Sequence, residues 1–182
     1  ATIGAIATTG AKPVFVDSKD DYNIDPGKIK EKITSRTRAI VPVHWSGRPC
    51  DMKSLWAISK EYDVPIIEDA CHALQTEYFN QRCGSLGMTG CFSFHPLKNL
   101  NVWGDGGIIT TDSDELADRL KLIRNHGLVG RNICKEFSYN SRLDTIQAVV
   151  ARYVLENKLE TITHNRRKNA RYLDENLRDI KA

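Results

Sequence analysis

The chain has 182 residues, of which 41% are hydrophobic and 27% charged, an ordinary composition for a globular protein with one substantial core. Its formal net charge of +3 gives no electrostatic basis for binding nucleic acid or an acidic membrane surface. No apolar run approaches the roughly 20 residues that a membrane-spanning helix needs.

The cysteines give no disulfide framework and no zinc site. There are five, without a C-x-x-C pair or a zinc-ligand spacing, at positions 50, 71, 83, 91 and 134. An odd number without a framework is typical of reduced thiols, so we expect a cytoplasmic protein without a bound metal. Because the chain begins at Ala1 without a methionine, we also expect it to be a piece of a longer protein.

The first elements along the chain are two strands around a short helical segment. The strands are predicted over residues 12–17 and 39–43, and Pro42 places the second near an end or edge of a sheet. Between them, Asp25 is a predicted helix N-cap with Pro26 at the first helical position.

A capped helix and a third strand follow. Asp51 is predicted to begin a helix that carries on one face Leu55, Ile58 and Tyr62. Residues 64–68 predict a strand that ends at Asp69.

The second half of the chain continues the alternation. An aromatic strand reaches Ser93, and residues 108–111 predict another strand. Asp112 and Glu115 resemble a capping box, which opens a helix with these residues facing inward: Leu116, Leu120 and Ile123. Further helical patterns cover residues 143–157 and about 160–178.

This alternation predicts an α/β domain with a mostly parallel sheet flanked by helices, and no domain boundary is visible before about residue 160. In such sheets ligands bind at the carboxyl ends of the strands. That rule selects the polar residues that follow three strands, in the ranges 44–47, 69–72 and 93–98.

Lys98 stands in a turn between two strands, away from any helix face. A solvated loop lysine is the ordinary alternative. Four apolar residues are expected to bury the segment instead, namely Phe92, Phe94, Val102 and Trp103. Burial lowers the pKa of a lysine and frees its amine to attack carbonyl groups and form Schiff bases.

Three polar side chains at the strand ends accompany Lys98, and each has an ordinary alternative. Asp69 could cap the next helix, His72 could be a hydrogen-bonded core histidine, and Ser93 could bond the backbone within its strand. Asn140, in Tyr139-Asn140-Ser141-Arg142, could be a polar residue at a helix start.

The stretch Ser93-Phe94-His95-Pro96-Leu97-Lys98-Asn99, followed by Gly104-Asp105-Gly106-Gly107, resembles the cofactor-lysine segment of the DegT/DnrJ/EryC1/StrS sugar aminotransferases. The resemblance extends over essentially the whole chain. It implies the large domain of a fold type I enzyme, similar to that of aspartate aminotransferase, with pyridoxal phosphate bound covalently to Lys98. The same amine would then carry the proton as general base and acid.

The resemblance also implies roles for the other candidates. Asp69 would pair with the protonated ring nitrogen of the cofactor, and His72 would lie near its phenolic oxygen. Ser93 would contact the phosphate. Asn140 would reach across a dimer interface to the phosphate of the neighbouring subunit, which implies a homodimer with shared active sites.

Family members have two segments that this chain lacks, an opening phosphate-binding segment and a small C-terminal domain. We therefore expect a domain incomplete at both ends, with a cofactor-binding large domain over residues 1–160 and a helix over 161–182 that leads toward the small domain.

The implied function is transfer of an amino group from glutamate or glutamine to a keto sugar, nucleotide-linked or free, or to a cyclitol. A non-catalytic, regulatory or truncated member that binds ligand without turnover is the alternative. The related sugar 3-dehydratases carry histidine at the lysine position, whereas this chain has Lys98 there and His95 three residues earlier. The substrate's identity does not follow from the sequence.

Overall fold

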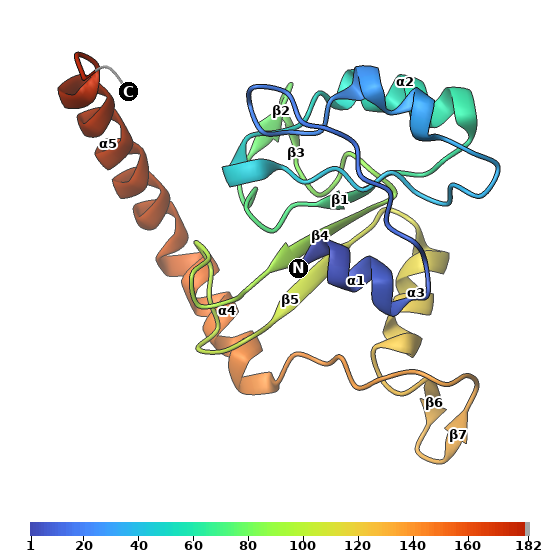
Figure 1. Ribbon diagram of the computed structural model, residues 1–182. Coiled ribbons are helices and arrows are strands. Elements are labelled where there is room, and N and C mark those ends of the chain that lie inside the picture. Colours follow the sequence, from blue (N-terminus) through green and yellow to red (C-terminus); the bar gives the residue numbers. More distant parts are fainter. Residues whose placement is uncertain (181–182) are drawn as a thin grey trace. The chain divides into compact units, whose positions relative to one another are not determined.

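The computed structural model describes residues 1–180 (Figure 1). They form two compact units, the first composed of Ala1–Ser93 and Gly107–Arg142, the second of Phe94–Gly106 and the residues from Leu143 onward. Helices and strands alternate along the chain as expected, and the α/β class is confirmed. The division into a large domain over 1–160 and a following helix stays a prediction.

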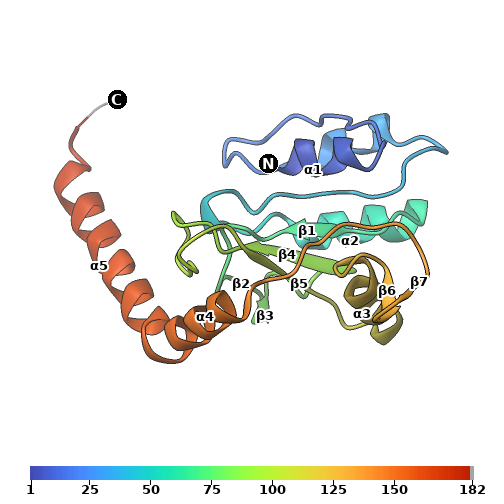
Figure 2. The same cartoon turned by 90° about the horizontal axis from the view of Figure 1, so that it is seen from below.

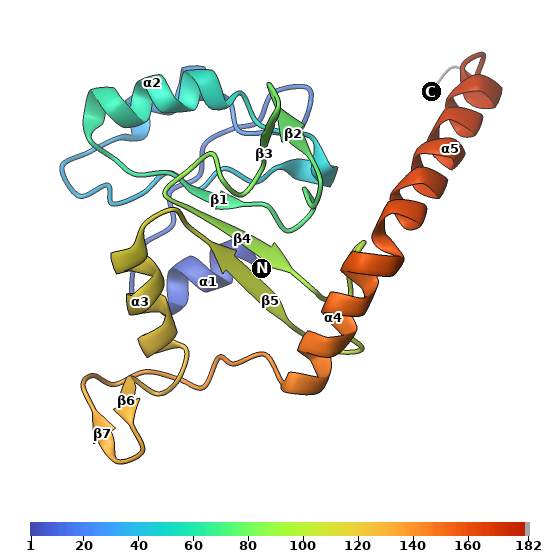
Figure 3. The same cartoon turned by 180° about the vertical axis from the view of Figure 1, so that it is seen from behind.

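The first unit is built on a sheet of β1 (Ile67–Asp69), β4 (Thr89–Ser93) and β5 (Gly107–Thr110), in the order β1-β4-β5 (Figure 3). Strands β1 and β4 are parallel, so their carboxyl ends meet at one edge of the sheet. Strand β5 returns antiparallel to β4, which makes this sheet mixed.

The strand predicted over 39–43 pairs with β1, although Pro42 interrupts its ladder. Ile40 and Val43 form parallel bridges to Ile66 and Asp69. The carbonyl of Pro42 accepts from the Asp69 amide at 2.9 Å, but proline has no N–H to return. The ladder is therefore broken into isolated bridges.

The strand predicted over residues 12–17 is wrong. This segment has no ladder to any described residue, and Val14 and Phe15 are 60% and 67% exposed. Apolar composition predicted a strand here, but a strand also needs a paired neighbour.

Helices cover both faces of the sheet in the first unit. Figure 2 shows α1 (Thr2–Thr8) on one side of β4 and β5 and α3 (Asp114–Ile123) on the other. Helix α2 is Met52–Tyr62. The unit also contains three short 3₁₀ helices and two hairpins: Pro26–Lys28, Lys30–Lys32, Trp45–Gly47, β2 (Glu77–Tyr78) with β3 (Gln81–Arg82), and β6 (Leu128–Gly130) with β7 (Ile133–Cys134).

Two of the predicted helix caps are confirmed and one is wrong. The carboxylate of Asp25 accepts from the Gly27 amide and that of Asp51 from the Ser54 amide, as expected. Helix α3 is capped by Ser113, whose hydroxyl accepts from the Leu116 amide at 3.2 Å. Asp112 lies one residue too early, because the helix begins at Asp114.

The core of the first unit lies under α2. Met52 and Leu55 are fully buried and Ile58 is 4% exposed. Tyr62 does not share this face, since it is 38% exposed. The Lys30 Nζ lies over its ring, 5.9 Å from the ring centroid. In the same core, burial raises the pKa of the Cys50 and Cys83 thiols to about 12, which keeps both neutral.

The second unit contains the loop around Lys98 and two helices, α4 (Thr145–Asn157) and α5 (Leu159–Leu177). Asp144 and Gln147 form a capping box on α4, and the Gln147 amide also donates to the Asp105 carbonyl at 2.9 Å. Within the described part of the chain, no helix is long and apolar enough to cross a membrane.

The loop around Lys98 is only partly buried as expected. Phe94 and Val102 are buried, at 6% and 1% exposure, whereas Trp103 is 81% exposed. Trp103 has a positive φ of 62°, and a residue in this left-handed conformation occupies a turn rather than a packed strand.

Gly90 provides a test of the packing between β4 and the preceding loop. A Cβ at this position would lie 2.2 Å from the Gly84 Cα, and backbone atoms cannot yield as a flexible side chain can. We expect Gly90→Ala to destabilise the intact protein by about 2 kcal/mol or more, measured as a lower urea midpoint. Gly130→Ala is the control, because nothing lies within 4 Å of a Cβ there. Equal midpoints for the two variants would contradict this packing.

Candidate active site

Asp69 is the last residue of β1, and its carboxylate is held by its neighbours rather than by a helix. Its Oδ1 accepts from the Cys71 amide at 3.1 Å, and its Oδ2 accepts from the Thr2 hydroxyl. No helix follows it in residues 70–76, so the helix-cap alternative does not apply.

The carboxylate of Asp69 stays ionised at neutral pH. Burial alone would raise its pKa, but hydrogen bonds from Cys71 and Thr2 outweigh burial and lower the pKa below its ordinary value of 3.8. A half-buried, ionised carboxylate at a strand end can hold a cationic group, such as a protonated ring nitrogen, by a charge-assisted hydrogen bond.

His72 lies in the turn after Asp69 and faces the loop that contains Ser46. Its Nδ1 accepts from the Ser46 amide at 3.3 Å, and its ring meets Trp45 edge-on with centroids 5.7 Å apart. The residue is exposed, which excludes the alternative of a core histidine.

Ser93 ends β4 on the same face of the sheet as Asp69. Asp69 is in register with Cys91, and alternate residues of a strand share a face, so Ser93 is two positions along on that face. The structure thus brings Asp69, His72 and Ser93 to the carboxyl edge of the parallel strands in the first unit.

Asn140 lies in an exposed loop after α3, away from the strand ends in sequence. Its main chain forms an isolated antiparallel β-bridge with Asn125, and its Oδ1 accepts from the Arg142 amide at 3.3 Å. The Arg142 guanidinium donates to the Asn125 side chain, so Arg142 steadies this loop. The helix that follows is capped by Asp144, which separates Asn140 from the helix start.

Lys98 belongs to the second unit. Its amide donates to the His95 carbonyl at 2.8 Å and closes the turn, and the residue is half-buried. Its role as the cofactor lysine stays a prediction.

Sequence reasoning missed a buried carboxylate directly before Asp69. Glu68 and His44 are both 0% exposed, and the His44 Nε2 and Glu68 Oε2 lie 2.9 Å apart. The other donors to Glu68 are three main-chain amides, those of Gly84, Leu86 and Gly87, at 2.6–2.7 Å. The available signal was a glutamate directly after the apolar run Val64-Pro65-Ile66-Ile67.

Hydrogen bonding explains how Glu68 remains charged in the core. Burial would raise its pKa, but the bonds from His44 and the three amides together lower it below the ordinary value of 4.5. On His44, Nδ1 accepts from the Cys50 amide at 3.1 Å, so the proton lies on Nε2 and points at Glu68.

Glu68, His44 and Cys83 place potential metal ligands within 4.8 Å of one another. Both carboxylate oxygens and both ring nitrogens already take part in the hydrogen bonds described above. The Cys83 thiol is neutral, since burial raises its pKa to about 12. A metal ion would have to displace this network, and we therefore regard the cluster as structural.

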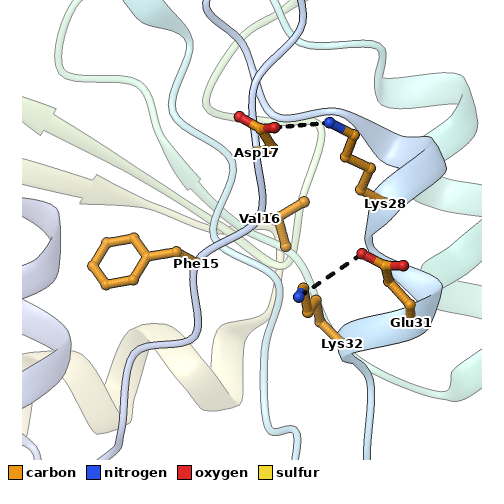
Figure 4. A pocket seen from close by; sticks show the side chains of 6 residues that line it. All are labelled: Phe15, Val16, Asp17, Lys28, Glu31 and Lys32. Atoms are coloured by element: carbon orange, nitrogen blue, oxygen red, sulfur yellow. Dashed lines mark hydrogen bonds and ion pairs between the residues drawn. The ribbon is translucent and has the colours of Figure 1, made fainter.

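A hollow of about 540 Å³ lies elsewhere in the first unit, lined by Phe15, Val16, Asp17, Lys28, Glu31 and Lys32 (Figure 4). Lys28 pairs with Asp17 at 2.8 Å and Lys32 with Glu31 at 3.8 Å. These two lysines and two acids cancel in charge, and no predicted site residue lines the hollow. We assign it no ligand.

The comparison with known proteins decides the family. The model of the DegT/DnrJ/EryC1/StrS aminotransferase family matches residues 1–182. The chain belongs to this family. Family members use pyridoxal phosphate, and the large-domain fold is that of fold type I aminotransferases.

The chain is similar over nearly its whole length to several proteins. A dTDP-3-amino-3,6-dideoxy-alpha-D-galactopyranose transaminase of Aneurinibacillus thermoaerophilus is 46% identical over 98% of this chain and 49% of its own length. A "Pleiotropic regulatory protein" of Geobacillus stearothermophilus is 42% identical over 99% of the chain and 50% of its own. The solved structure of DesV from S. venezuelae aligns with a TM-score of 0.93 at 37% identity, over 99% of this chain and 48% of that one. The chain therefore spans about half the length of the relatives it matches.

The residues of the first unit fit the family cofactor. An ionised carboxylate and a hydroxyl share one face at the carboxyl edge of the parallel strands, which offers a partner for a cationic ring nitrogen and a donor for phosphate. Both groups are therefore compatible with bound pyridoxal phosphate.

Glu68 provides a pH-dependent test of the buried network. Because its folded pKa is lowered, it stabilises the fold above its ordinary pKa of 4.5, and this contribution is lost as the pH falls through the folded pKa. Glu68→Gln is expected to destabilise the intact protein by about 3 kcal/mol at neutral pH. The NH2 group of glutamine would face main-chain N–H groups, which are also donors, and the negative charge would be lost. The difference from wild type, measured by urea unfolding, should shrink as the solution is acidified.

Glu61→Gln is the matched control. Glu61 has an ion pair with Lys30 at 2.6 Å but is half exposed, so its loss should leave the urea midpoint nearly unchanged. A Glu68→Gln variant as stable as the control at neutral pH would contradict the role given to the network.

Proposed function

We propose that the full-length protein is a pyridoxal-phosphate-dependent aminotransferase that transfers an amino group from glutamate or glutamine to a keto sugar or cyclitol. The observation that carries the proposal is the ionised carboxylate of Asp69 at the carboxyl end of β1, on the same face as Ser93. A nucleotide-linked sugar is favoured as acceptor, because relatives at 40–46% identity are named as transaminases of dTDP- and UDP-linked sugars.

Bound pyridoxal phosphate would supply an electron sink for the carbon that loses its proton. Asp69 would keep a proton on the ring nitrogen by its negative charge. Lys98 would hold the cofactor through its amine, and the same amine would move the proton at the substrate carbon. Ser93 would donate its hydroxyl to the phosphate, and His72 would lie near the phenolic oxygen.

A shared dimer site is part of the proposal. Asn140 stands in an exposed loop where a neighbouring subunit could contact it, and a two-fold axis would make this contact reciprocal. Its amide offers two N–H donors to phosphate oxygens without adding charge.

We also place the protein in the cytoplasm, since none of its five cysteines forms a disulfide.

A regulatory member without turnover is the second candidate. It is supported by the name of the 42% identical relative from Geobacillus stearothermophilus. Retention of Lys98, Asp69 and Ser93 together favours the aminotransferase, because a protein that only binds ligand has no need of all three.

The assignment of Lys98 can be tested by chemical labelling. Incubation of the full-length protein with pyridoxal phosphate and reduction with borohydride should fix the label on the peptide that contains Lys98. Lys98→Ala should abolish labelling there and transamination while it leaves the fold intact. Lys60→Ala is the control, because this exposed lysine lies at the end of α2. Label on another lysine, or none, would overturn the assignment, and label without turnover would favour the regulatory candidate.

The shared site can be tested by complementation between two inactive variants. Lys98→Ala and Asn140→Ala subunits are mixed and allowed to exchange. One site of a mixed dimer then carries both defects and the other neither, so up to about half of the activity should return in mixed dimers. If exchange is demonstrated and no activity returns, the sites are not shared.

A further inference from the structure

The loop from His44 to Cys50 is held by hydrogen bonds to Asn23, a polar residue that is 2% exposed. The Asn23 Oδ1 accepts from the Trp45 amide at 2.9 Å. Its Nδ2 donates to the carbonyls of Arg48 and Pro49, both at 3.2 Å. One buried side chain therefore makes hydrogen bonds at three points of the same loop.

The ends and the tip of this loop are held as well. Glu68 fixes the ring of His44, which in turn accepts from the Cys50 amide. At the tip, the Thr76 hydroxyl donates to the Gly47 carbonyl at 2.9 Å. Gly47 has φ = 84°, and a Cβ there would lie 2.7 Å from the His72 carbonyl oxygen, so only glycine allows this approach.

These hydrogen bonds hold the loop so that Trp45 and Ser46 contact His72. The main-chain N–H of Ser46 points at the Nδ1 of His72, and Trp45 packs its ring edge against the imidazole. A ring nitrogen that accepts a hydrogen bond carries no proton in the neutral imidazole, so the proton lies on Nε2.

We propose that the His44–Cys50 loop sets the orientation and tautomer of His72, with Asn23 as its positioning residue. His72 then presents Nε2–H as a donor at the edge where Asp69 holds a negative charge. Use of this donor toward an oxygen of the cofactor rests on the proposed function. The fixed tautomer does not, because it follows from contacts within the first unit.

Nuclear magnetic resonance on the cofactor-free, full-length protein tests the contact directly. In ¹⁵N-labelled protein at a pH where the ring is neutral, we expect a ¹⁵N–¹⁵N coupling across the hydrogen bond between the Ser46 amide and the His72 Nδ1. His72→Gln identifies the signal by its loss. Absence of the coupling in the wild-type protein, or a protonated Nδ1, would overturn the proposal.

Asn23→Ala tests the positioning role, with Asn132→Ala in the exposed turn of the β6–β7 hairpin as control. We expect the coupling to vanish in Asn23→Ala and to persist in the control, at equal folded fractions. If Asn23→Ala does not fold, Thr76→Val replaces it, since this variant removes only the bond to Gly47 and should weaken the coupling. An undiminished coupling in the folded variant contradicts the proposal.

A second measurement separates this inference from the proposed function. Affinity for pyridoxal phosphate should fall about tenfold in Asn23→Ala, the loss expected for one displaced hydrogen bond. If the wild-type protein binds no pyridoxal phosphate but shows the coupling, the proposed function fails and the positioning role stands. If it binds the cofactor equally well with and without Asn23, the Nε2–H of His72 does not donate to the cofactor.

Discussion

The buried carboxylate of Glu68 is the constraint on which the site depends. It sits in the middle of the core, fully covered, and accepts from His44 and from three main-chain amides of the segment 84–87. Loss of one of these donors would weaken the compensation of a buried charge, which is costly in a medium of low polarity. Two loops are thereby fixed to β1 one residue before Asp69.

Two adjacent carboxylates in β1 serve opposite purposes because a strand alternates its faces. Glu68 points to the side where the protein itself satisfies both oxygens. Asp69 points to the other face, toward Thr2 and the carboxyl edge, where it is only half-buried. Both have a lowered pKa, yet only Asp69 stands where a ligand can reach it.

Local rules in the sequence predicted much of the first unit. The rule that ligands gather at the carboxyl ends of parallel strands selected Asp69, His72 and Ser93, and the structure brings all three to one edge. What local patterns could not supply was pairing and burial. Residues 12–17 have strand composition without a partner strand, and Trp103 is aromatic yet exposed. The Glu68 network was missed because its donors are main-chain amides, which carry no residue-type signal.

The central claim is that Glu68 organises the edge while Asp69 receives the cofactor. A crystal structure of the full-length protein with pyridoxal phosphate tests it most directly. We expect the Asp69 carboxylate within hydrogen-bonding distance of the ring nitrogen, about 3 Å, with Glu68 still bonded to the segment 84–87. A ring nitrogen bound elsewhere, or Glu68 turned from its amides toward the ligand, would contradict the account.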